Sequence, residues 1–108
     1  MIDKMVSIGL PTYNRAGTIQ QTIDSLLAQT YRNFELIISD NASTDETEKI
    51  CEEYAARDSR IRYIRQKENI GAAANFNFVL QEARGEYFMW ACDDDLWEPD
   101  FIHDLVDL

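Results

Sequence analysis

The chain is poor in basic residues and in cysteine, and each shortage excludes a class of protein. Its 108 residues include 10 Lys or Arg against 20 Asp or Glu, which gives a formal net charge of -10. That charge argues against nucleic acid or an anionic membrane as a partner for the bulk of the surface. The two cysteines, Cys51 and Cys92, show neither metal-ligand nor redox spacing. We expect both to be small core residues in a reducing compartment.

Long apolar runs are also lacking. No stretch approaches the ~20 apolar residues that cross a bilayer, and the N-terminus shows no apolar targeting segment. We therefore expect a cytoplasmic location, with membrane association only through segments beyond this chain. The only histidine, His103, falls on an amphipathic helical pattern, where a surface residue is expected. That helical pattern, 100–108, stops without a closing signal, so we expect residues 1–108 to be one portion of a domain truncated at its C-terminus.

Short β-rich runs alternate with longer helical periods, and this alternation predicts an α/β fold with an open, mostly parallel sheet flanked by helices. The predicted strands are 5–10, 34–39, 61–65 and 87–92. The predicted helices are about 17–29, 43–57 and 70–83, with another beginning near residue 100. The third run alternates enough to be an edge strand, whereas the apolar fourth run predicts a buried, central strand.

Local signals add detail to two of these helices. Ser43 followed by Glu46 predicts a capping box at the start of the second helix. In the third helix, the residues expected to face inward in part are Ala72, Ala73, Phe76, Val79 and Leu80.

A polar cluster follows each predicted strand. Since ligands bind outside the carboxyl ends of the strands in such sheets, we expect these clusters to form one binding rim. The clusters are 11–15, 40–43, 65–69 and 93–95.

The last cluster consists of three consecutive carboxylates, Asp93, Asp94 and Asp95. Adjacent carboxylates repel one another, and a divalent cation that prefers oxygen ligands removes that cost. This pattern indicates a Mg or Mn site, in which Asp93 and Asp95 are candidates to serve ribose and metal. The alternative is an acidic turn that caps the following helix.

The other rim residues fit a nucleoside diphosphate, and each has a structural alternative. Tyr13 offers a face for base stacking or packs on a neighbouring helix. Asp40 accepts from a base imide or a ribose hydroxyl, or it is a turn residue bonded to its own backbone. Arg15 and Lys67 are candidates for phosphate contacts, although Lys67 also fits a solvated edge charge.

Four segments in order, 8–15, 38–45, 69–71 and 93–95, resemble the successive motifs of family 2 glycosyltransferases. The first two read Ile-Gly-Leu-Pro-Thr-Tyr-Asn-Arg and Ile-Ser-Asp-Asn-Ala-Ser-Thr-Asp. The resemblance implies a Rossmann-like GT-A fold and metal-dependent transfer, with inversion, of a sugar from a nucleotide diphosphate sugar. UDP is the favoured carrier, because it is the commonest in the family. The implied acceptor is a carbohydrate or lipid-linked hydroxyl in polysaccharide biosynthesis, and a homodimer is among the expected partners.

The resemblance also implies roles for individual residues. Asp40 and the segment around Pro11 to Tyr13 would bind the base, Asp94 would lie near ribose or donor sugar, and Asp95 would hold the metal. The general base is expected beyond residue 108, so this chain alone would turn over weakly or not at all. The complete set of implied donor-binding residues is Pro11, Thr12, Tyr13, Asn14, Arg15, Asp40, Asn41, Ser43, Lys67, Asn69, Gly71, Asn75, Asp93 and Asp94, with Asp93 and Asp95 at the metal.

The sequence departs from the family pattern in the third helix. Many relatives carry Ala-Arg-Asn where this chain has Asn75-Phe76-Asn77. A phosphate-binding arginine is therefore replaced by phenylalanine, and Asn75 and Asn77 are either neutral donors or solvated helix residues.

Three other classes are weighed against the glycosyltransferase. A receiver-like module would need acidic residues after the first strand, where Pro11 and Thr12 stand. A nucleotidyltransferase would carry a Gly- and Lys-rich loop at the same place, and the chain has none. A pure interaction module would show no nucleotide-dependent stabilisation.

Overall fold

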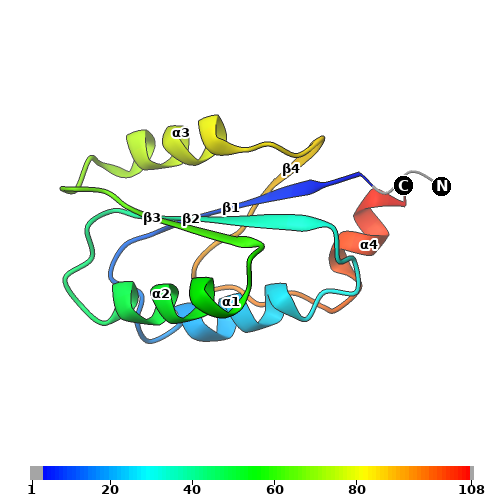
Figure 1. Cartoon of the computed structure of the whole chain (residues 1–108), viewed down its shortest axis with the longest axis horizontal. Coiled ribbons are helices and arrows are strands. Elements are labelled where there is room, and N and C mark those ends of the chain that lie inside the picture. The colour runs from blue at the N-terminus through cyan, green and yellow to red at the C-terminus, as the bar shows by residue number, and fades with distance from the viewer. Residues whose placement is uncertain (1–3, 108) are drawn as a thin grey trace.

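The computed structural model describes residues 4–107 and shows a four-stranded parallel sheet in the order β3-β2-β1-β4. The α3 helix covers one face of this sheet, and α1 and α2 cover the other (Figure 1). This arrangement confirms the predicted α/β class. The elements are β1 (Val6–Thr12), α1 (Ile19–Leu27), β2 (Phe34–Asp40), α2 (Thr47–Arg57), β3 (Ile61–Arg65), α3 (Ala72–Glu82), β4 (Tyr87–Trp90) and α4 (Phe101–Val106).

The two central strands carry the core. All seven residues of β1 and all seven of β2 are buried, because helices cover both faces of a parallel sheet. Their register pairs Leu10 with Ile38 and Thr12 with Asp40, so both strands end at the same level. β3 lies at one edge, as its alternating sequence predicts.

β1 is longer than the sequence predicts, because Pro11 does not end it. Pro11 pairs with Ser39 of β2 inside the strand. On the other side of β1, pairing with β4 stops at Gly9 and Trp90. The N–H that Pro11 lacks would point toward the β4 side, past the end of this pairing. Its absence therefore removes no hydrogen bond from the sheet.

The prediction that β4 is central and buried is wrong for the described residues. β4 pairs with β1 alone and forms an edge of the sheet, and the side chains of Tyr87 and Trp90 are 42% and 41% exposed. An apolar run predicts a strand but does not reveal how many neighbours it has. Because the strand ends at Trp90, Cys92 lies in the following turn and is exposed, so its predicted place in the core is also wrong. Cys51 is buried as predicted.

Two predictions about helices also need correction. The predicted capping box at the start of α2 does not form, since the Ser43 hydroxyl bonds to Asp40 instead of to the helix. The N–H of Thr47, the first residue of α2, donates to the Asp45 side chain at 2.9 Å. In α3, Phe76 and Leu80 are 44% and 51% exposed, and Val79 is the one predicted inward residue that is buried. The α3 helix therefore contacts the sheet with a narrow face. Within residues 4–107, none of the helices has the length and apolarity to span a bilayer.

A polar stripe fixes the chain after β4, and sequence reasoning missed its partners. The α1 stripe consists of Thr18, which directly precedes the helix, and of Thr22 and Ser25 within it. Thr18 and Thr22 donate to the carbonyls of Asp93 and Asp95, each at 2.9 Å. One turn further, the Ser25 hydroxyl accepts from the N–H of Trp97. The spacing of these hydroxyls places them on one side of the helix. The segment after β4 therefore runs back along α1 to α4.

Candidate functional site

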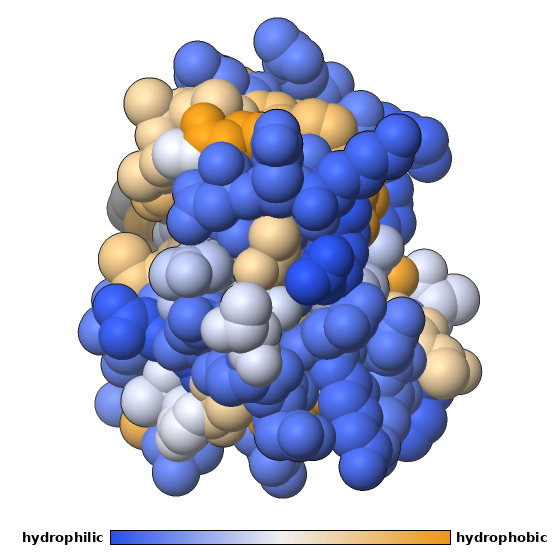
Figure 2. Space-filling model, turned by 90° about the vertical axis from the view of Figure 1, so that its left-hand side faces the viewer, coloured by the Kyte–Doolittle hydropathy of each residue, from blue (hydrophilic) through white to orange (hydrophobic). Residues whose placement is uncertain are grey.

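The loops that follow the four strands meet at one end of the sheet, on the left of Figure 1. Figure 2 looks onto this end, where hydrophilic residues cover most of the surface and apolar residues gather near the top, over α3. The rim predicted from the sequence is therefore present.

Reciprocal hydrogen bonds join the loop after β1 to the loop after β2. The N–H of Asn14 donates to the Ser43 hydroxyl at 2.8 Å, and the Asn14 side-chain oxygen accepts from the N–H of Thr44 at 2.8 Å. Asn14 has a positive φ of 51°, a conformation that asparagine adopts more readily than most residues. These bonds set the direction of the chain on either side of Asn14, where Tyr13 and Arg15 stand.

Asp40 lies beneath this junction and is fully buried. Its carboxylate accepts from the N–H and the hydroxyl of Ser43, at 2.9 and 2.5 Å, and from the Tyr63 hydroxyl at 2.7 Å. Burial, together with the bond to Asp40, raises the pKa of the Tyr63 hydroxyl well above its usual range. Burial also raises the pKa of the Cys51 thiol to about 12, with the charge of Asp40 contributing. The contacts of Asp40 therefore favour the turn role that the sequence leaves open.

Asn41, the next residue, connects the end of β2 to the start of α3. Its amide donates to the Asn69 side chain at 3.0 Å and accepts from the N–H of Ile70 at 2.8 Å. Asn69 in turn accepts from the N–H of Gly71, whose φ of 87° strains any residue that carries a Cβ. The motif at 69–71 thus fixes where α3 begins.

Asn75 is buried in α3 and bound to the backbone and side chain of β2. It donates to the Ser39 carbonyl at 3.0 Å and accepts from the Ser39 hydroxyl at 2.7 Å. Its amide therefore anchors α3 to the sheet, a contact that neither alternative in the sequence anticipates.

A cavity of about 290 Å³ opens at the rim between α3, the end of β1 and the turn after β4. The predicted donor-binding residues that line it are Pro11, Thr12, Tyr13, Arg15, Asn41, Asn75 and Asp93. The others, Asn14, Asp40, Ser43, Lys67, Asn69, Gly71 and Asp94, lie outside the lining. Several of these hold lining residues in place, and Lys67 is exposed on the loop after β3.

Two aromatic residues of the lining escaped the sequence analysis as site residues. Phe76 and Trp90 form part of the wall, with ring centroids 4.9 Å apart. The departure from the family pattern at Phe76 was a signal, but its pairing with Trp90 joins two separate elements, α3 and β4, and no local pattern reveals it.

Thr12 carries an unsatisfied hydroxyl beside this cavity. Among the described residues, its Oγ1 is the one buried side-chain oxygen or nitrogen without a hydrogen-bond partner. Such atoms are rare in native proteins because each one costs free energy, and they often mark a site.

The acidic run lies at the edge of the cavity with its backbone fixed and two of its side chains open. Asp93 accepts from Arg15 Nε at 3.3 Å, and its side chain is 15% exposed. Asp94 and Asp95 are exposed. Burial raises the pKa of the neighbouring Cys92 thiol, and the three carboxylates raise it further.

The carboxylates of this run supply some, but not all, of the ligands that a Mg or Mn ion needs. Within residues 4–107, no group of three or more His, Cys, Asp or Glu is arranged around one point. The chain therefore offers one or two carboxylates rather than a complete cage. Mg is commonly held by one or two carboxylates plus the phosphates of a substrate, so Asp93 and Asp95 suit an ion that arrives with a diphosphate.

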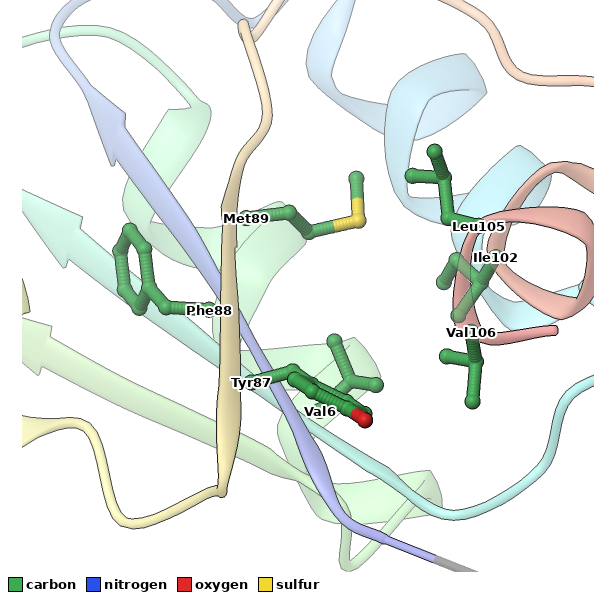
Figure 3. Close-up of a pocket in the computed structure, with 7 residues that line it drawn as sticks. All are labelled: Val6, Tyr87, Phe88, Met89, Ile102, Leu105 and Val106. Atoms are coloured by element: carbon green, nitrogen blue, oxygen red, sulfur yellow. The ribbon is translucent and has the colours of Figure 1, made fainter. Parts of the chain in front are cut away.

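A larger cavity, of about 380 Å³, lies between β4 and α4, and the residues that line it are mostly apolar. Figure 3 shows its lining residues, Val6, Tyr87, Phe88, Met89, Ile102, Leu105 and Val106. It lies near the start of β1 and β4, away from the rim, and it offers no charged group to a phosphate. His103 stands on α4 with an exposed side chain 3.6 Å from Asp104, as expected of a surface residue.

Comparison with known proteins supports a family assignment. Residues 7–108 match the family model described as Glycosyl transferase family 2. The chain is 34% identical to the glycosyltransferase GlyA of Streptococcus pneumoniae over 97% of its length and 15% of that protein. It is 39% identical to an uncharacterized glycosyltransferase of Rickettsia typhi, over 96% of its own length and 31% of the relative. The chain thus spans less than half of these relatives.

Solved structures show the same fold. A structure of S. aureus TarS in complex with UDP superposes with a TM-score of 0.87 and 28% identity, over 94% of this chain and 31% of TarS. The mannosyltransferase PcManGT from Pyrobaculum calidifontis, in complex with GDP-Man and Mn2+, gives a TM-score of 0.87 and 29% identity. That match covers 95% of this chain and 31% of PcManGT.

Proposed function

The chain belongs to glycosyl transferase family 2, and from that premise we propose that it forms the donor-binding part of an inverting, metal-dependent enzyme that transfers a sugar from a nucleotide diphosphate sugar. The cavity at the strand ends, edged by the acidic run, is the observation that carries the proposal. The bound UDP of TarS and the bound GDP-Man and Mn2+ of PcManGT support it by similarity. UDP remains the favoured carrier.

Different residues of the cavity bind different parts of the donor. Tyr13, 44% exposed at the rim, offers a ring face to the base. Asn41 presents an amide whose second hydrogen and second lone pair remain available for the base edge. Asp40 lies beneath the site and contacts the donor only indirectly. Its carboxylate accepts from the Ser43 hydroxyl, and this hydroxyl in turn accepts from the N–H of Asn14.

Asp95 and Asp93 would hold the divalent ion, with Asp94 near the ribose or the sugar. When bound, the ion stabilises the negative charge that develops on the leaving nucleoside diphosphate. Arg15 keeps Asp93 in place and adds positive charge at the same edge. The hydroxyls of Thr18 and Thr22 fix the backbone that carries these carboxylates.

Thermal unfolding with UDP, in the presence and absence of Mn, tests this proposal. A ligand that binds only the folded chain at 100 times its Kd adds about 2.7 kcal/mol of stability. We expect a shift with UDP that grows when Mn is present. The single variants Asp93→Asn, Asp94→Asn and Asp95→Asn then assign the ion, because the variant of a true ligand loses the part that depends on Mn.

The outcomes separate the possibilities. Loss of the Mn effect in Asp95→Asn is expected, whereas its loss in Asp94→Asn alone would move the ion to Asp94. No shift with UDP, GDP or dTDP, with or without Mn, would contradict the proposal for this chain. A receiver-like module would instead respond to Mg without any nucleotide.

A further inference from the structure

One wall of the cavity is aromatic at the place where the family pattern predicts an arginine. Phe76 of α3 and Trp90 of β4 both line the cavity, and their ring planes are tilted by 41° at a centroid distance of 4.9 Å. Both side chains remain open, at 44% and 41% exposed. Large aromatic rings that stay this exposed side by side form an apolar patch of the kind that marks a binding surface.

The wall is supported from below, so its shape is set before a ligand arrives. Phe88 packs edge-on against Trp90, with ring centroids 4.7 Å apart. Gly9 leaves the space for both rings, because a Cβ there would lie 2.8 Å from the Phe88 ring and 3.2 Å from the Trp90 ring. A preformed surface of this kind loses little conformational entropy on binding.

The acidic edge and the aromatic wall of the cavity differ in charge, so they suit different parts of the donor. Among the described residues that line it, Arg15 is the one cation, and it already pairs with Asp93. A diphosphate would therefore lie at the acidic edge with its metal ion, and the uncharged wall is left for a ring system. Aromatic side chains bind nucleobases by stacking, which needs no charge.

We propose that Phe76 and Trp90 hold the nucleoside part of the donor by ring contact, together with Tyr13. This inference rests on the proposed function and deepens it. The aromatic wall replaces the charge of the expected arginine, so binding of the nucleoside itself is insensitive to salt. Salt affects only the contacts made by the diphosphate.

Trp90 supplies its own reporter for the test. The chain has two tryptophans, and the conservative change Trp97→Phe leaves Trp90 as the single one. Fluorescence of this variant is measured during titration with UDP, uridine and inorganic pyrophosphate, and thermal unfolding of the same samples reports binding independently. We expect uridine and UDP to change the emission of Trp90, and pyrophosphate to leave it unchanged.

Three variants locate the contact. Trp90→Leu and Phe76→Ala should weaken UDP binding about ten-fold or more, in line with the stacking of a base on an aromatic ring. Leu80→Ala is the matched control, because Leu80 lies one turn from Phe76, is 51% exposed and does not line the cavity. Phe76→Arg should weaken uridine binding and make UDP binding depend more strongly on salt.

The outcomes distinguish this inference from the function on which it rests. If UDP stabilises the chain while Trp90 emission stays constant and Trp90→Leu binds UDP normally, the aromatic wall is overturned and the donor site stands. If no nucleoside diphosphate stabilises the chain, both fail. Circular dichroism of each variant shows whether it is folded, and Phe76→Ala replaces Trp90→Leu if the latter is not.

Discussion

The acidic residues of the rim follow two strands of the same sheet, β2 and β4, which lie on either side of β1, and the fold treats them in opposite ways. Asp40, at the end of β2, is fully buried and accepts three hydrogen bonds from Ser43 and Tyr63. Asp94 and Asp95, after β4, are exposed. The Asp95 carboxylate has the neighbouring Cys92 thiol as a hydrogen-bond partner, and the bond from Thr22 goes to the Asp95 backbone carbonyl. We call the first the closed acidic site and the second the open acidic site.

This difference separates two roles that look alike in a sequence. A carboxylate whose oxygens are all bonded to the protein contributes to stability and positions its neighbours. A carboxylate held mainly through its backbone keeps its oxygens available for a metal ion or a ligand. The closed site should therefore govern folding, and the open site should govern binding. Four changes test that contrast.

The largest effect is expected at the closed site. Asp40→Ala leaves the Ser43 N–H, the Ser43 hydroxyl and the Tyr63 hydroxyl without an acceptor in a buried place. Each unsatisfied buried group costs about 1–3 kcal/mol, so we expect a loss of about 3 kcal/mol or more in the free energy of unfolding. Urea unfolding measures it. Asp40→Asn should cost less, because an amide can still accept from Ser43 and donate to Tyr63. A loss below about 1 kcal/mol for Asp40→Ala would show that the site is not closed in solution.

How much of this could be read from the sequence differs between the sites. The α/β fold and the rim were predictable, because strand runs, helical periods and polar strand ends are local signals. The closed state of Asp40 was not, since its Tyr63 partner comes from β3 and only strand order brings the two together. The same holds for Trp90, whose edge position follows from the neighbours of β4.

The α1 stripe illustrates a further limit of sequence reasoning. Thr18, Thr22 and Ser25 form a pattern that is also typical of a solvated helix face. Each of their bonds to the segment after β4 joins residues that are 72 to 75 positions apart in the sequence. No local pattern reveals contacts at that distance along the chain, although they fix the acidic run in space.

The second effect concerns the backbone of the open site. Thr22 is 1% exposed, and its hydroxyl donates to the Asp95 carbonyl. Thr22→Val keeps the shape of the side chain and removes this bond, so we expect a loss of about 1–2 kcal/mol in stability. The Mn-dependent part of the stabilisation by UDP should fall as well, because the carboxylate of Asp95 is no longer held in place. Thr22→Ser, which retains the hydroxyl, should restore the Mn effect. Equal Mn effects in the Val variant and the parent would exclude a positioning role.

A smaller effect is expected in the pH dependence of stability, through Asp45, an exposed residue in the loop after β2. Burial acts to raise the pKa of Asp45, but hydrogen bonds from Thr47 and from the N–H of Ala16 outweigh it and hold the pKa below its usual value of 3.8. A lowered pKa in the folded chain means that these bonds stabilise it above about pH 4. The contribution is lost as the pH falls through the folded-state value.

Asp45→Asn provides the matched measurement. The difference in unfolding free energy between the parent and this variant should be constant from pH 7 to about 5 and shrink as the pH falls below about 4. Urea unfolding at fixed ionic strength over that range measures it. A difference that stays constant down to pH 3 would mean that the bonds to Ala16 and Thr47 do not depend on the charge.

The smallest effect on stability is expected for Asp94→Asn, and it is the sharpest test of the contrast. Asp94 is exposed between two other carboxylates, so removal of its charge leaves no buried partner unsatisfied and relieves some repulsion within the run. We expect the unfolding free energy in the absence of metal to change by less than about 0.5 kcal/mol, with any gain larger at low salt. Asp40→Asn, the same chemical change at the closed site, is the control and should be clearly more destabilising. If Asp94→Asn instead costs more than about 1 kcal/mol, its carboxylate supports the fold as Asp40 does. The acidic run would then be a structural turn rather than an open site for an ion.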